Sequence, residues 1–125
     1  MTAGQMEIRV DSEKFAWVTS VGVPMEEREL ALAVQGQSFA PMFDEKLTVC
    51  AWKTKPCWFV ISTNDHMLPP AMEESAAQAL GASATTLATC HMAMLEQPSQ
   101  VAAVIGDAAK KSLGSSKKDM FSEVA

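Results

Sequence analysis

The chain has 125 residues, of which 48% are hydrophobic and 20% charged, an ordinary globular composition for one small domain. Ten basic and 15 acidic residues give a net charge of −5. This balance argues against nucleic acid as a partner, because phosphate binding needs a basic face. No stretch approaches the ~20 apolar residues of a membrane span, and the first ten residues do not resemble a signal peptide. We therefore expect a cytoplasmic protein without nucleic-acid or membrane partners.

The first 50 residues read as a helical and irregular segment. Residues 11–12 can cap a short helix. Pro24, followed by acidic residues, begins a second helix that is expected to run to about residue 35 and to end at Gly36.

The clearest strand is 57–62, a continuous apolar run of the kind that is buried on both faces of a parallel sheet. A proline pair then opens a helix expected over 71–80, and Gly81 ends it. A threonine-rich strand is expected over 83–88. Pro98 opens a last helix, expected to end near Lys111.

The order strand, helix, strand, helix over 51–111 predicts an α/β fold with a parallel βαβα unit. Residues 112–125 are expected to form a flexible tail. The three cysteines are an odd number without C-x-x-C spacing, which favours a reducing compartment and predicts neither a disulfide framework nor a zinc site. No cofactor is indicated.

Two ionisable residues follow the two strands. Asp65 comes shortly after the first strand and His91 shortly after the second. Functional residues of open α/β sheets lie beyond the carboxyl ends of the strands, so both should emerge at one rim. A carboxylate beside an imidazole is half of a relay that activates a nucleophile. The alternative for Asp65 is a role in closing a turn, since Asn-Asp pairs favour turns.

The sequence around these two residues resembles α/β-hydrolase-fold proteins. The stretch W-K-T-K-P-C-W at 52–58, continuing to Asp65, is similar to the penultimate strand and acid loop of small esterase-like hydrolases. The threonine-rich strand and the stretch C-H-M-A-M-L-E-Q-P at 90–98 resemble the last strand and histidine loop. Residues 7–50 look more loosely like the cap segment that precedes this half.

The resemblance implies that Asp65 is the acid and His91 the base of a catalytic triad. The third member is expected in a G-x-S-x-G motif upstream, which this sequence does not contain. Ser20 and Ser83 each have only one of the flanking glycines. Cys90 stands where serine is common in the family, and we expect it to be a packed residue.

The resulting expectation is a truncated or inactive esterase-like hydrolase related to enzymes that act on small carbonyl substrates. Two parallel strands do not make a self-sufficient sheet, so a homo-oligomer or a complementing hydrolase half is expected to cover them. The alternatives are a non-catalytic fragment that binds a partner or small ligand, half of a split hydrolase, and, more remotely, lyase or cyclase chemistry without covalent attack.

Overall fold

The structure is a computed structural model that describes residues 7–8, 21–36 and 38–122. The helix expected after residues 11–12 lies outside these residues. In chain order the elements are β1 (Glu7–Ile8), α2 (Met25–Ala33), β2 (Ser38–Phe39), the 3-10 turns η1 (Ala40–Asp44) and η2 (Ala51–Lys53), β3 (Trp58–Ser62), α3 (Pro70–Ala79), β4 (Ser83–Leu87), α4 (Ala93–Glu96) and α5 (Pro98–Ser122).

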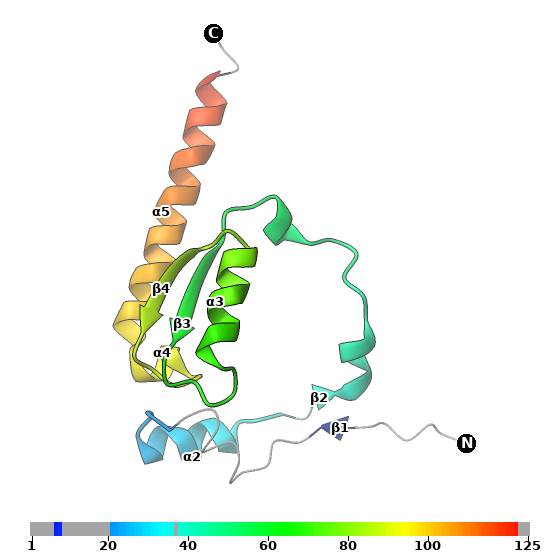
Figure 1. Cartoon of the computed structure of the whole chain (residues 1–125), viewed down its shortest axis with the longest axis vertical. Helices are drawn as coiled ribbons and strands as arrows, with labels where there is room; N and C mark the ends of the chain where they lie inside the picture. The colour runs from blue at the N-terminus through cyan, green and yellow to red at the C-terminus, as the bar shows by residue number, and fades with distance from the viewer. Residues whose placement is uncertain (1–6, 9–20, 37, 123–125) are drawn as a thin grey trace, which may run out of the picture.

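The predicted βαβα unit is confirmed. Strands β3 and β4 pair in parallel, with Trp58 opposite Ser83 and Ser62 opposite Leu87. Helices α3 and α5 both contact β3, and the sheet lies between them (Figure 1). The apolar sequence of β3 follows from this arrangement, because helices cover the strand from both faces.

The buried apolar side chains gather where the two strands end. Ile61 and Leu87 lie in the last two residues of their strands, and Ala77 comes from α3. Val23, just before α2, Cys90, in the loop after β4, and Ala93, in α4, are buried as well. Packing is therefore tightest at the rim where Asp65 and His91 leave the sheet.

Helix α3 ends in a Schellman motif, which fixes the turn into β4. The N–H of Ala82 donates to the carbonyl of Ala77 at 2.9 Å, and the N–H of Gly81 donates to that of Gln78 at 3.0 Å. Gly81 has φ +58°, a left-handed conformation that glycine adopts without a Cβ clash. The predicted helix end at Gly81 is confirmed.

Two helix ends differ from the prediction. Helix α2 ends at Ala33 instead of residue 35. The end expected for the last helix near Lys111 is wrong, because α5 continues to Ser122 through part of the expected tail. Gly114 lowers helix propensity by only about 1 kcal/mol relative to alanine, and the stretch contains no proline that would break the helix.

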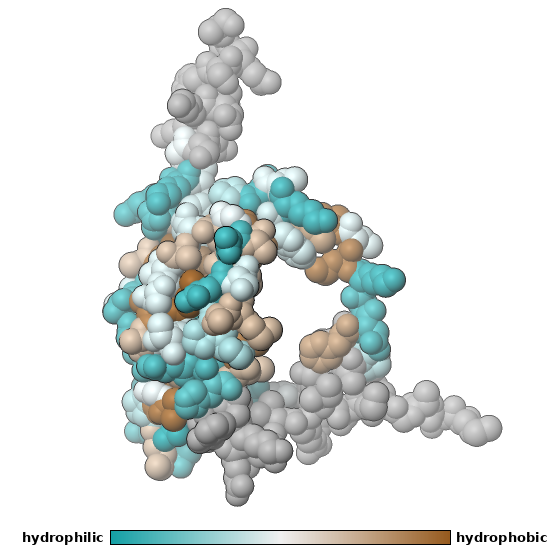
Figure 2. Space-filling model, in the orientation of Figure 1, coloured by the Kyte–Doolittle hydropathy of each residue, from teal (hydrophilic) through white to brown (hydrophobic). Residues whose placement is uncertain are grey.

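Residues 38–56 form an arc that stands away from the sheet (Figure 1). Figure 2 shows apolar residues both on this arc and on the side of the sheet and helices that faces it. Phe43, Leu47 and Val49 on the arc, and Met72 on α3, are largely exposed. Among the helices of the described ranges, none combines the length and apolar character needed to cross a membrane.

Candidate acid–base site

The parallel ladder continues beyond the strands and sets the two loops side by side. The N–H of Thr63 donates to the carbonyl of Leu87 at 2.9 Å, and the N–H of Asn64 donates to that of Thr89 at 3.0 Å. Asp65 then turns away, with its N–H 3.3 Å from the carbonyl of Ser62. The site thus arises from strand register, as predicted for the carboxyl ends of parallel strands.

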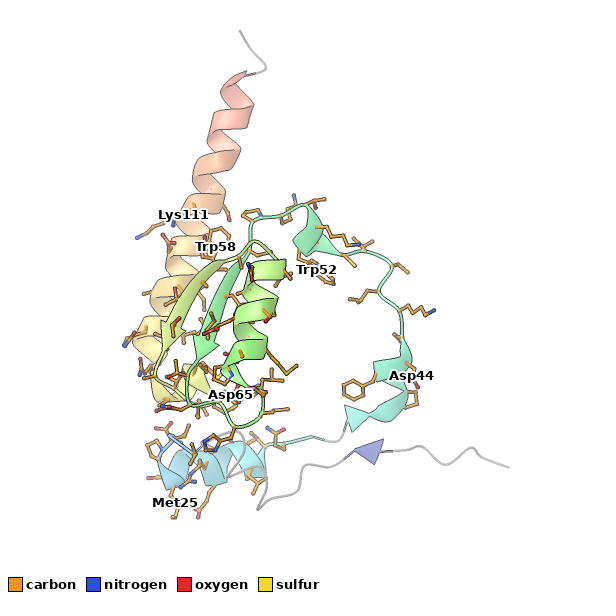
Figure 3. The ribbon with its side chains drawn as sticks, in the orientation of Figure 1. Met25, Asp44, Trp52, Trp58, Asp65 and Lys111 are labelled. Atoms are coloured by element: carbon orange, nitrogen blue, oxygen red, sulfur yellow. The ribbon has the colours of Figure 1, made fainter. Side chains whose placement is uncertain are left out.

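Asp65 and His91 meet at this rim. The Asp65 Oδ2 lies 2.7 Å from the His91 Nδ1. The Asp65 side chain is fully buried, whereas the His91 side chain is 30% exposed. The predicted juxtaposition is confirmed: a buried carboxylate contacts one nitrogen of an imidazole that reaches the surface. Figure 3 shows Asp65 beyond the end of β3 nearest α2, opposite the end that carries Trp58 and lies toward Lys111 of α5.

The second carboxylate oxygen of Asp65 is held by the backbone. Oδ1 accepts hydrogen bonds from the N–H of Met67 at 2.6 Å and of Leu68 at 3.0 Å. Burial by itself would raise the pKa of the Asp65 carboxyl, but the hydrogen bonds to His91 and to these two amides bring it below its ordinary value. Asp65 is therefore an anion near neutral pH, and it selects the tautomer in which His91 carries its proton on Nδ1.

A second carboxyl, Glu73, lies against the pair. Glu73 belongs to the first turn of α3 and is buried, and its Oε2 accepts a 2.6 Å hydrogen bond from the N–H of Ser62. Burial raises the pKa of Glu73 above its ordinary value, and the neighbouring Asp65 adds to the rise against the opposing effect of the Ser62 N–H. This residue was not among those predicted from the sequence.

A signal for Glu73 exists in the sequence. Glu73, Ala77 and Leu80 are spaced by four and three residues, so they share one face of a helix. That face carries the two residues of α3 that the structure buries, Glu73 and Ala77. An acidic residue in register with an apolar stripe is a candidate for a buried, partnered group.

Hydroxyl and thiol groups near His91 have structural partners. The Thr89 Oγ1 donates to the Ser62 Oγ at 3.1 Å inside the core and ties the two loops together. Cys90 is buried, its N–H donates to the Glu96 Oε2 at 2.7 Å, and burial raises the pKa of its thiol. A buried thiol with a raised pKa is a poor nucleophile, so the expectation of a packed Cys90 is confirmed.

The two serines weighed as nucleophiles do not join the site. Ser83 pairs with Trp58 at the start of β4, the opposite end of the strand from His91, and Ser20 lies outside the described residues. A hollow of about 460 Å³ also lies at that far end, lined by Trp58, Ser83 and residues of α5. It contains neither Asp65 nor His91, so the hollow and the acid–base pair are separate features.

Asp65, Glu73 and His91 are also the set that could hold a metal ion within the described ranges, with ligand atoms within 4.8 Å of one another. The carboxylate oxygens nevertheless accept internal hydrogen bonds from Ser62, Met67 and Leu68. The arrangement fits proton handling better than metal ligation, because the Asp65 Oδ2 and the His91 Nδ1 already share a hydrogen bond that a metal ion bound between them would break.

Comparison with known proteins agrees with this geometry. A family model described as the alpha/beta hydrolase family matches residues 5–104. No match is found among curated proteins. The matched region contains Asp65, Glu73 and His91 together with both strands, and it extends into the N-terminal segment. The chain belongs to the alpha/beta hydrolase family.

Proposed function

We propose that this protein carries the acid–base half of an esterase-type hydrolase that acts on a small carbonyl substrate. The observation that supports this most directly is the 2.7 Å contact between the Asp65 Oδ2 and the His91 Nδ1, with Asp65 buried and His91 at the surface. In this role Asp65 orients His91 and stabilises the imidazolium, while His91 is the general base.

The proton path follows from the tautomer. With a proton on Nδ1 directed at Asp65, the His91 Nε2 carries the lone pair that takes a proton from an attacking hydroxyl. The hydroxyl and the oxyanion-stabilising donors belong to polypeptide outside these 125 residues, since no G-x-S-x-G motif occurs here. A second copy of the same sequence would not bring that motif, so the complementing polypeptide differs in sequence.

The sheet offers an edge for such a polypeptide. The Thr63 N–H and the Cys57 carbonyl bond to β4. Because backbone groups alternate in direction along a strand, those of Trp58 and Val60 point to the other edge. Within the part of the chain that the structure describes, no strand pairs there. A strand added at this edge would also cover part of the exposed apolar surface.

The test is complementation. The chain alone is expected to leave a p-nitrophenyl ester unhydrolysed, and hydrolysis should appear on mixing with a separate hydrolase half that contains G-x-S-x-G. His91→Ala should then lower kcat by ~10³-fold or more. His66→Ala removes an exposed imidazole next to Asp65 and is the matched control, expected to keep most of the activity. Equal rates for the two variants would rule out the proposed role of His91.

A non-catalytic binding module is the second candidate, and the absent G-x-S-x-G motif favours it. In that case His91→Ala leaves assembly with a partner unchanged, whereas Trp58→Ala abolishes it. Ester hydrolysis by the assembled complex separates the two functions, because only the catalytic one depends on His91 once the halves have bound. The three free thiols, Cys50, Cys57 and Cys90, support a cytoplasmic location for either.

A further inference from the structure

The Glu73 carboxyl has no part in the relay between Asp65 and His91, yet it is built into the same site. It is buried, its Oε2 accepts the Ser62 N–H at 2.6 Å, and one of its oxygens lies within 4.8 Å of a carboxylate oxygen of Asp65 and of a ring nitrogen of His91. The Ser62 N–H points to the edge of β3 that faces away from β4, so Glu73 also closes that edge at its last residue.

We propose that Glu73 is a positioning residue that keeps a proton between its own carboxyl and that of Asp65, and so holds the Asp65 carboxylate against His91. One Glu73 oxygen accepts the Ser62 N–H, and the protonated oxygen donates to Asp65. Asp65 then faces donors from Glu73, His91 and the backbone. This inference rests on the proposed role of Asp65 and His91, and it extends their relay by one carboxyl.

The physical reason is that two buried carboxyls at this separation cannot both be anions without strong repulsion. The charged groups that face Glu73 are Asp65, from the loop after β3, and His91, from the loop after β4. Backbone N–H donors at Met67 and Leu68 favour the anion on Asp65. Glu73 has one such donor, Ser62. The pair therefore settles with the charge on Asp65 and the proton on Glu73, in line with the opposite directions of their pKa shifts.

Two substitutions of Glu73 test whether its donor and acceptor groups hold Asp65 in place. Glu73→Gln keeps an oxygen that accepts the Ser62 N–H and an amide that donates to Asp65, and it does so at every pH. Glu73→Ala removes both. The adjacent Glu74 is exposed on the same helix turn, so Glu74→Gln makes the same chemical change away from the site and is the matched control.

The test follows the protonation of Glu73 and His91 by NMR in the 125-residue chain, and it does not depend on catalytic turnover. Carboxyl ¹³C NMR should show Glu73 titrating at higher pH than the exposed glutamates. The His91 Nδ1–H proton signal should broaden as Glu73 loses its proton in the wild type and in Glu74→Gln. In Glu73→Gln the signal should persist over that whole pH range, and in Glu73→Ala it should be lost throughout. Circular dichroism verifies that each variant is folded.

Two results would overturn the inference: a Glu73 carboxyl that titrates with the exposed glutamates, or a Glu73→Gln variant that loses the His91 signal as Glu73→Ala does. If Glu73→Ala does not fold, Glu73→Gln and the carboxyl titration still decide. Because these readouts are independent of ester hydrolysis, a failed complementation experiment leaves them interpretable, and a failed proton measurement leaves the relay of Asp65 and His91 standing.

Discussion

The two carboxylate oxygens of Asp65 have different hydrogen-bond partners and different roles. Oδ1 closes the turn by accepting the N–H groups of Met67 and Leu68, and Oδ2 contacts His91. The turn-forming and acid roles that the sequence offered as alternatives are therefore compatible. The turn fixes the carboxylate in one orientation, which is the condition for an acid that must align an imidazole.

Replacement of this carboxylate should lower stability in a pH-dependent way. Asp65→Asn removes the charge while keeping the size of the side chain. It is expected to lower the free energy of unfolding by about 1–3 kcal/mol at neutral pH, as is typical for a broken buried hydrogen-bond network. The pKa of Asp65 in the folded chain lies below its ordinary value of 3.8. Its contribution is thus fully present above about pH 4 and is lost as the pH falls through the lower, folded value.

Urea denaturation of Asp65→Asn and the wild type at about pH 7 and about pH 2.5 measures this difference. The gap in the free energy of unfolding between the two proteins should be large at the higher pH and should narrow at the lower one. A gap of equal size at both values would show that the effect comes from packing and not from the charge of Asp65.

At the level of elements, the sequence was informative where local pattern and burial agree. The apolar run of β3, the prolines that open α3 and α5, and Gly81 after α3 each specify a feature through their own chemistry, and the structure contains all of them. The meeting of Asp65 with His91 followed from the parallel order alone. These features depend on rules that need no knowledge of distant contacts.

What the sequence did not reveal depends on tertiary contacts. In α3 the apolar Met72 is 60% exposed, whereas the adjacent, ionisable Glu73 is buried, which is the reverse of what hydropathy alone predicts. The helix is oriented about its axis so that Glu73 faces the sheet and accepts a hydrogen bond from the Ser62 N–H, a contact between residues eleven positions apart. Helix α5 likewise continues past Lys111, because a single glycine weakens a helix without ending it.

Two glycines of this unit should respond to alanine in opposite directions. Gly81 has φ +58°, so Gly81→Ala should lower the free energy of unfolding by about 1 kcal/mol, because a Cβ is strained in the left-handed region. Gly106 lies inside α5, with open space around the position that a Cβ would occupy. Gly106→Ala should therefore raise the free energy of unfolding by about 0.5–1 kcal/mol, because alanine has the higher helix propensity. Thermal denaturation followed by circular dichroism measures both. A stabilising Gly81→Ala would contradict the assigned cap.

At the scale of the whole molecule, one feature dominates: the core is small and sits at one end of a two-stranded sheet. The other edge of β3 is unpaired among the described residues, and apolar side chains remain exposed on both the arc and α3. Edges and patches of this kind pair with another polypeptide or with a second copy. The proposed complementing half would cover both at once.

Without that half, the same surfaces should drive weak self-association. We expect the isolated chain to form dimers or larger species at micromolar to millimolar concentrations, in the range where exposed edges aggregate. Met72→Lys replaces an exposed apolar side chain of α3 with a charged one and should shift sedimentation toward monomer. Leu113 is 70% exposed on α5, so Leu113→Lys adds the same charge elsewhere and serves as the control. Sedimentation velocity over a concentration series distinguishes them. A wild-type chain that stays monomeric throughout, or an equal effect of both lysines, would show that the exposed apolar surface at Met72 does not drive association, and the complementing partner would then have to bind elsewhere.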